Sequence, residues 1–261
     1  MSPAHISLPL VRAIWLSIAA FIAGAINAMA GGGSFLSFPA MLGVGVPPIQ
    51  ANATNTVALW PGQAVSIFGF RRDLAAHTHL LWPVILSGAV GGTIGALVLL
   101  HTGQTTFLRL VPWLLLIAAT LFWVSGPLGQ WVLQRRHSSQ SDPSILPLSI
   151  CLTAVCFYIG YFGAGAGFLI MAILGLFGVE SINEINALKV IGTTLANGCA
   201  VITFIFRGAV VWRHCLVAML MAAAGGFIGA KLARRMNPAR LRTFVVILGF
   251  AMAAYFFWRL R

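Results

Sequence analysis

The sequence has few charged residues, and almost none of them are acidic. Only 8% of its 261 residues are Asp, Glu, Lys or Arg, against about 25% in a typical soluble domain. With 59% hydrophobic residues, the chain lacks the polar surface that a water-soluble globule of this length would need. The composition therefore predicts an all-α polytopic membrane protein.

Other absences exclude several kinds of chemistry. The four acidic residues stand at the ends of apolar runs, so catalysis by paired carboxylates is not expected. No Walker motif is present, and the four cysteines lack metal-binding spacing. We predict a protein that is not an enzyme and has no cofactor and no metal site. The alternative is an intramembrane enzyme acting on lipid or peptide, with Ser34 as nucleophile.

Basic residues outnumber acidic ones, which gives a formal net charge of +12. The chain has no nucleic-acid motif and no basic patch interleaved with aromatics, so we expect no nucleic-acid partner. Most Lys and Arg residues flank apolar runs, as the positive-inside rule describes. The expected surroundings are a lipid bilayer.

Ten apolar runs divide into two sets of five. The sequence predicts a first transmembrane repeat over 1–133, a polar linker over 134–147 and a second repeat over 148–261. The runs cover roughly 10–30, 34–46, 50–70, 79–100 and 107–125, then 145–162, 168–179, 185–206, 213–233 and 241–258.

The two sets align at an offset of 134 residues. Gly91-Gly92-x-Ile94-Gly95-Ala96 matches Gly225-Gly226-x-Ile228-Gly229-Ala230, and Asn52-Ala53 matches Asn186-Ala187. This pattern indicates an internal duplication, which is typical of secondary transporters.

The runs 34–46 and 168–179 are short for a membrane span. We predict two homologous halves of four spans, each with a short half-spanning or re-entrant segment. The alternative is five plus five inverted spans. Counting Lys and Arg by side gives nine against six for either topology, so the charge rule does not decide between them.

Glycines interrupt the apolar sequence once in each half. Helix breaks in lipid occur only inside protein or beside a water-filled cavity, and paired breaks in two halves indicate a transporter's binding site. Short helices that begin at Ser34 and Phe168 would direct N–H groups toward an anion. Alternatively, the glycines only allow close helix packing. The predicted substrate-binding residues in the breaks are Gly31, Gly32, Gly33, Ser34, Gly163, Gly165 and Gly167.

Polar residues follow both short runs at helical spacing. One stripe contains Asn52, Thr56 and Gln63, and the other contains Asn186, Lys189, Thr193 and Asn197. Lys189 lies in the middle of a run, where it could attract an anion, pair with Glu184 or Glu180, or snorkel to the nearer surface. Asn52 and Asn186 could instead be helix N-caps. From these stripes we predict Asn52, Asn55, Asn186 and Lys189 as further substrate-binding residues, Asn55 being the counterpart of Lys189.

These motifs resemble the sulfite exporter TauE/SafE family of bacterial membrane transporters. The resemblance is carried by G-A-I-N-A-M-A-G-G-G-S-F-L-S-F-P at 24–39, A-N-A-T-N-T at 51–56, G-A-G-A-G-F-L at 163–169 and N-A-L-K at 186–189. The second copy departs from the family pattern, because Met171-Ala172 stands where a counterpart of Pro39 would be expected.

The resemblance implies a multi-pass protein of the bacterial inner membrane with about eight spans. It also implies transport of small anions such as sulfite, sulfonates or other sulfur-containing or organic anions, driven by ion or substrate gradients. We therefore predict a secondary transporter that exports or exchanges a small anionic solute. A passive anion channel is the second alternative, and a homo-oligomer is compatible with the sequence.

Overall fold

The chain folds into ten helices in the part that the computed structural model describes, which is 9–29, 31–70, 80–134, 145–164, 167–177, 179, 182–233 and 238–260. Each predicted apolar run corresponds to one helix, so the all-α prediction is confirmed. Most of the predicted linker, 135–144, lies outside the described residues. The helices are α1 (Leu10–Met29), α2 (Ser34–Gly43), α3 (Pro48–Phe70), α4 (Leu81–His101), α5 (Gln104–Gln134), α6 (Ile145–Tyr161), α7 (Gly167–Leu176), α8 (Ile182–Phe206), α9 (Trp212–Ala233) and α10 (Pro238–Arg259).

The outer surface of the bundle is apolar. Large hydrophobic side chains are exposed on most helices, including Trp82 near the start of α4 (66%) and Trp258 near the end of α10 (77%). Tryptophans at helix ends are typical of membrane–water interfaces. Five helices in the described residues are long and apolar enough to cross a membrane: α1, α4, the 104–124 part of α5, the 184–206 part of α8 and the 212–232 part of α9. The chain is a multi-pass membrane protein.

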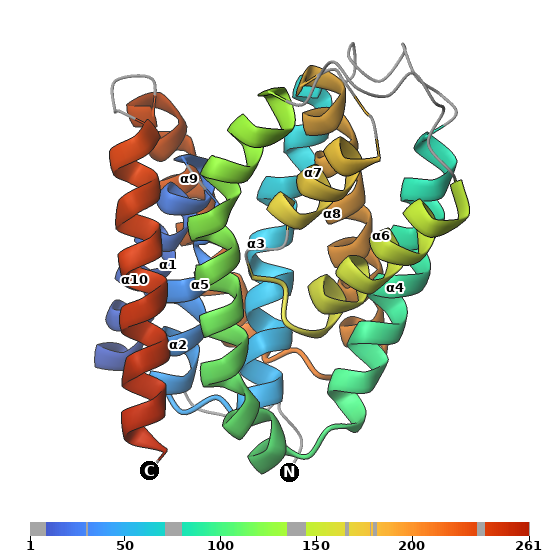
Figure 1. Cartoon of the computed structure of the whole chain (residues 1–261). Helices are drawn as coiled ribbons and strands as arrows, with labels where there is room; N and C mark the ends of the chain where they lie inside the picture. Colours follow the sequence, from blue (N-terminus) through green and yellow to red (C-terminus); the bar gives the residue numbers. More distant parts are fainter. Residues whose placement is uncertain are drawn as a thin grey trace.

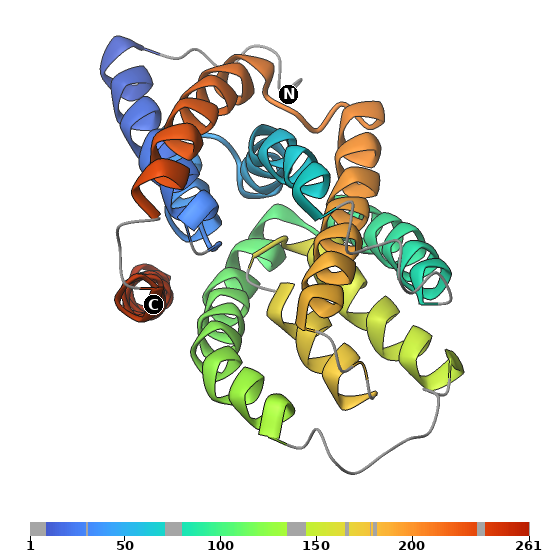
Figure 2. The same ribbon diagram turned by 90° about the horizontal axis from the view of Figure 1, so that it is seen from above.

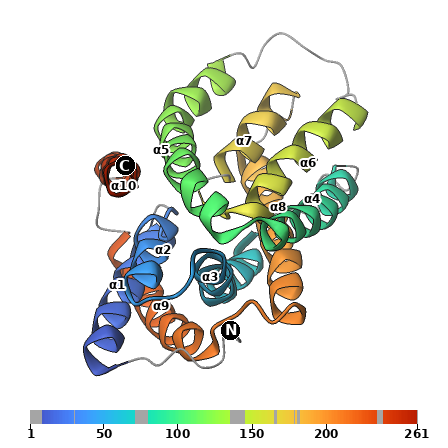
Figure 3. The same cartoon turned by 90° about the horizontal axis from the view of Figure 1, so that it is seen from below.

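The helices form two groups that each combine both halves of the sequence. Figures 2 and 3 show α1, α2, α9 and α10 on one side, with α4, α6, α7 and α8 on the other. The helix α1 packs extensively against α9, and its counterpart α6 packs in the same way against α4. The helix α3 lies between the groups and contacts both α8 and α9.

The two similar glycine clusters, one on α4 and one on α9, produce these two close packings. A Cβ added at Gly95 on α4 would collide with the carbonyl oxygen of Phe157 on α6. A Cβ added at Gly229 on α9 would lie 2.6 Å from Cα of Ala25 on α1. The clusters thus serve the small-residue packing that brings membrane helices together.

Replacing Gly225 with Ala is expected to destabilise the protein by about 1–3 kcal/mol, because the added methyl group would overpack the α1–α9 contact. Its Cβ would lie 2.7 Å from the carbonyl carbon of Phe21. The neighbouring Gly226→Ala is the matched control, since its Cβ would meet only the oxygen of Gly24 at 3.6 Å. Thermal unfolding in detergent should show a lower Tm for the first variant only. Equal Tm values would contradict the packing account.

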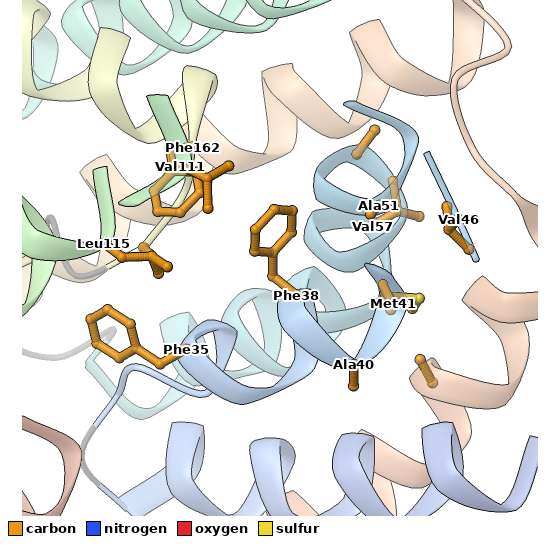
Figure 4. Close-up of a cluster of buried hydrophobic side chains, with 14 of the residues drawn as sticks. Phe35, Phe38, Ala40, Met41, Val46, Ala51, Val57, Val111, Leu115 and Phe162 are labelled. Carbon is orange, nitrogen blue, oxygen red and sulfur yellow. The ribbon is translucent and has the colours of Figure 1, made fainter. Parts of the chain in front are cut away.

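Aromatic side chains fill the interior where the two groups meet. Phe38 on α2 makes edge contacts with Phe107 and Phe162, at centroid distances of 6.3 and 5.7 Å, and stacks on Phe256 at 6.4 Å. Figure 4 shows Phe38 directed into this cluster from α2. Such pairs contribute about 0.5–1.5 kcal/mol each beyond the burial of their area, and they join α2 to α5, α10 and the end of α6.

The helix directions alternate along the chain. In Figure 1, α3, α5 and α9 end at the upper end of the bundle, whereas α4, α8 and α10 end at the lower end. The short helix α2 returns along α1 to the lower end, and α7 runs to the upper end. The last helices of the two halves, α5 and α10, therefore end at opposite ends.

Candidate functional site

The first glycine break closes the end of α1 with left-handed residues. Gly31 has φ 77° and its N–H donates to the carbonyl of Asn27 at 3.1 Å, while Gly32 has φ 87°. This is the left-handed cap that glycine forms without steric cost. Gly163, which follows α6, has φ 76°, so the second break begins in the same way.

The first break reverses the chain so that α2 packs along α1. A Cβ added at Gly33 would collide with the carbonyl oxygen of Ala23, and one at Gly43 would lie 3.6 Å from Nε1 of Trp15. The glycines Gly31 and Gly32 lie against Phe122 of α5 and Val245 of α10. The surroundings of this break are therefore mainly apolar.

The N–H groups at the start of α2 are partly used within the turn. Phe35 donates to the carbonyl of Gly32 at 3.0 Å, and Leu36 donates to that of Gly33 at 3.0 Å. These two donors do not serve a solute. The half-buried Ser34 precedes them at the first position of α2.

The second break lies against polar side chains. A Cβ added at Gly163 would be 3.5 Å from both Oγ1 of Thr56 and Oδ1 of Asn197. One added at Gly167 would be 3.4 Å from Thr193 and 3.7 Å from the aliphatic part of Lys189. Gly165 lies outside the described residues. The two breaks thus differ in their surroundings: among the described residues, Gly163 and Gly167 of the second break lie against the predicted polar stripes.

The two polar stripes face each other where α3 packs against α8. Asn197 donates from Nδ2 to Oε1 of Gln63 at 3.0 Å, and Trp60 donates from Nε1 to the carbonyl of Thr194 at 3.0 Å. Both pairs are separated by 134 residues, the offset that aligns the halves. In both pairs, therefore, the bonded residues are ones that the alignment of the two halves matches with each other. We define the α3–α8 seam as Asn52, Thr56, Trp60, Gln63, Lys189, Thr193, Thr194 and Asn197.

The N-cap interpretation of two asparagines is wrong. α3 begins at Pro48 and α8 at Ile182, so Asn52 and Asn186 are each the fifth residue of a helix. The buried Asn52 donates from Nδ2 to the carbonyl of Tyr161 at 3.1 Å and thereby ties α3 to the end of α6. The long-range partner explains its position in the helix.

Lys189 lies in the interior of the bundle on α8. Its Nζ donates to Oδ1 of Asn186 at 3.1 Å, one turn earlier on the helix, and Glu184 is also buried on α8. Lys189 is the eighth of the 25 residues of α8, and a lysine within a transmembrane helix is costly, up to about 2.5–3.5 kcal/mol at the helix centre. Such a residue is by default a functional one.

Asn55 is the counterpart of Lys189 in the first half. Its side chain is only 3% exposed, and its Oδ1 accepts no hydrogen bond from any described residue. A buried amide oxygen without a donor costs about 1–3 kcal/mol. The halves therefore differ at this position in the type of side chain and in its hydrogen bonding.

A cleft of about 580 Å³ lies between α1, α3 and α9. Half of its lining residues are glycine or alanine, such as Gly24, Gly62 and Ala223. Its polar residues are Asn27, Gln63 and Ser66. Because Gln63 also accepts the hydrogen bond from Asn197, it connects the cleft to the α3–α8 seam.

Of the predicted site residues, the structure gathers one subset around α8 and separates the rest. The second break meets, through Gly167, the face of α8 that carries Lys189, which bonds Asn186. Asn52 bonds the carbonyl of Tyr161 at the end of α6. The first break lies apart from this face, against α1, α5 and α10. Sequence reasoning missed Trp60 and Tyr161, although the spacing of 134 between Trp60 and Thr194 was a usable signal.

Comparison with known proteins gives matches along most of the chain. The profile of the family "Sulfite exporter TauE/SafE" matches residues 16–256. A "Probable membrane transporter protein" of Haemophilus influenzae is 28% identical over 236 residues, which cover 90% of each chain. The "Probable membrane transporter protein ORF9" of Sinorhizobium sp is 30% identical over 240 residues, covering 92% of this chain and 90% of the relative.

A third relative, the "Probable membrane transporter protein YfcA" of Escherichia coli K12, is 27% identical over 242 residues. The match covers 92% of this chain and 87% of that protein. No solved structure gives a significant match.

Proposed function

Because the chain belongs to the sulfite exporter TauE/SafE family of membrane transporters, we propose that it is a secondary transporter that exports or exchanges a small anion across the bacterial inner membrane. Sulfite, sulfonates and other sulfur-containing or organic anions are the proposed substrates. The solute contacts the α3–α8 seam, with Lys189 as the cation that attracts it.

The observation that carries this proposal is the position of the polar residues. They line the interface between two central helices, while the outer surface is apolar. Polar groups buried within transmembrane helices mark solute pathways. The half-buried ammonium group of Lys189 and the neighbouring side-chain amides favour a small oxyanion, since each has more than one N–H group with which to donate hydrogen bonds.

The helix directions support an inverted arrangement of the two halves. Each half contributes four long helices and one short one, and the first half begins at the lower end of the bundle in Figure 1 while the second begins at the upper end. We therefore favour five plus five inverted elements over halves of equal orientation. Inverted repeats of this kind place the binding site at their common interface.

This topology predicts that the polar linker and the two termini lie on opposite sides of the membrane. Cysteines placed at Ser2, Ser138 or Arg261 can be labelled with a membrane-impermeant thiol reagent in intact cells and in inverted vesicles. The Ser138→Cys site should react from one side, and both terminal sites from the other. Labelling of all three from the same side would favour halves of four spans each.

The alternative of an intramembrane enzyme receives no support from Ser34. A serine nucleophile needs a base within hydrogen-bond reach. The described part of the chain contains His101, which bonds the carbonyl of Leu97, and His214, whose ring nitrogens have no hydrogen-bond partner there. Neither bonds Ser34.

Uptake by proteoliposomes tests the proposed substrate class. The purified protein is reconstituted and offered a panel that contains sulfite, sulfate, a small sulfonate and a small carboxylate, with and without a pH gradient. Saturable uptake of at least one anion above the level of protein-free liposomes is expected. If no anion moves under either condition, the proposed function is wrong.

A further inference from the structure

The cleft between α1, α3 and α9 distinguishes the two halves at equivalent positions. A Cβ added at Gly92 of α4 would lie 2.7 Å from Cα of Ala196 of α8. At the offset of 134, the counterparts of Ala196 and Gly92 are Gly62 of α3 and Gly226 of α9. Gly62 has no atom within 4 Å of its added Cβ, and Gly226 has only the oxygen of Gly24 at 3.6 Å. The α4–α8 contact is closed, whereas its α9–α3 counterpart is open.

The glycine breaks also differ between the halves. The second break covers α8, because Gly167 contacts Thr193 and Lys189. In the first break the counterpart of Gly167, Gly33, contacts Ala23 of α1 instead. Asn55, the counterpart of Lys189, is left with an amide oxygen that no described residue satisfies.

We propose that this cleft is the aqueous vestibule through which the anion reaches the α3–α8 seam from one side of the membrane, and that the packed α4–α6–α8 contact is the same vestibule in its closed form on the other side. The inference rests on the proposed transport function. If the two halves are related by a two-fold axis, each can adopt the conformation of the other, and the vestibule then opens on the opposite side of the membrane. In this exchange Gly62 and Gly226 come together while Gly92 and Ala196 separate.

Gln63 lies at the boundary between the two vestibules. Its side chain lines the cleft and accepts the hydrogen bond from Asn197, its own counterpart. In the exchanged state Asn197 would line the opposite vestibule in the same way. The side-chain amides of Asn27 and Gln63 supply neutral donors that a hydrated anion meets in the cleft, whereas the hydroxyl of Ser66 donates to the carbonyl of Gln63 at 2.6 Å.

Thiol labelling tests the vestibule without requiring transport. Ala230 lines the cleft and is exposed, whereas its counterpart Ala96 is fully buried. Cysteines are introduced singly at these positions, and their modification by a charged, impermeant reagent is followed by peptide mass spectrometry, which separates them from the native cysteines. Ala230→Cys should react at least about tenfold faster than Ala96→Cys, because the closed state hides the second site. Reaction of Ala230→Cys only with a lipid-soluble reagent would show that lipid fills the cleft and would overturn the proposal.

A second variant tests the exchange. Gly62→Leu places a side chain in open space, so the variant should fold, but the leucine blocks closure against Gly226. Labelling of Ala96→Cys and the transport rate should both fall at least about tenfold, because the exchanged state is depopulated. Gly92→Leu should have the opposite effect on Ala96→Cys if it folds. If Ala96→Cys is labelled at the same rate with and without Gly62→Leu, the proposed exchange of conformations between the halves is wrong.

The two proposals can fail separately. If the labelling changes as expected while no anion is transported, the proposed substrate class is wrong and the vestibule inference is retained. If anions are transported while both sites label equally and Gly62→Leu has no effect, the vestibule inference is wrong and the transport function stands.

Discussion

Replacing Lys189 with Met is expected to weaken binding of the transported anion by roughly 10- to 150-fold. The substitution keeps the length of the side chain and its helix propensity but removes the half-buried cation. Hydrogen bonds to charged groups contribute about 1.5–3 kcal/mol, and each 1.4 kcal/mol corresponds to a tenfold change. The change should appear as a higher KM for uptake in proteoliposomes, measured with the anion that the wild-type protein transports best.

Two further variants separate the charge from other effects. Lys189→Arg keeps the cation and should retain more transport than Lys189→Met, although the planar guanidinium will not fit identically. Arg259→Met removes an exposed cation in the last turn of α10, where Arg259 donates to the hydroxyl of Tyr255, and should leave KM unchanged. If Lys189→Met transports with the wild-type KM, the lysine does not attract the solute.

Replacing Gly33 with Ala is expected to destabilise the α1–α2 hairpin by about 1–3 kcal/mol or more. Gly33 has an ordinary helical backbone, with φ −54° and ψ −28°, so conformational strain is not the cause. The added Cβ would collide with the backbone carbonyl of Ala23, which cannot move aside as a flexible side chain can. The Tm in detergent and the yield of folded protein should both fall.

Gly43→Ala is the matched control for this variant. Gly43 ends the same helix, and its added Cβ would make an ordinary contact with Trp15 at 3.6 Å. Because Ala is a better helix former than Gly by about 1 kcal/mol, Gly43→Ala should keep or raise the Tm. A larger loss for Gly43→Ala than for Gly33→Ala would contradict the hairpin packing.

Much of the fold could be predicted from apolar run length alone. Water is excluded from a bilayer core, so each span must satisfy its own backbone as a helix. The interruptions at Gly31–Gly33 and Gly163 also appear where glycine content predicts them, since both begin with a left-handed residue.

The packing of helices from one half of the chain against helices of the other half could not be predicted from run length. α1 packs against α9 and α6 against α4, and run lengths carry no information on such distant contacts. The sequence also could not predict that the two glycine breaks have different surroundings, because Gly33 and Gly167 stand in similar motifs but contact different helices. The N-cap alternative for Asn52 failed for the same reason: its partner, the carbonyl of Tyr161, is 109 residues away.

Solute counterflow tests the central claim, that the chain is a carrier for small anions, most directly. Proteoliposomes are loaded with the unlabelled anion that gives the highest uptake and diluted into a trace of the labelled anion. A carrier with alternating vestibules should accumulate label transiently above its equilibrium level, and Gly62→Leu should abolish this overshoot. Label that enters without an overshoot, at a rate linear in concentration, would contradict the account and indicate a passive channel.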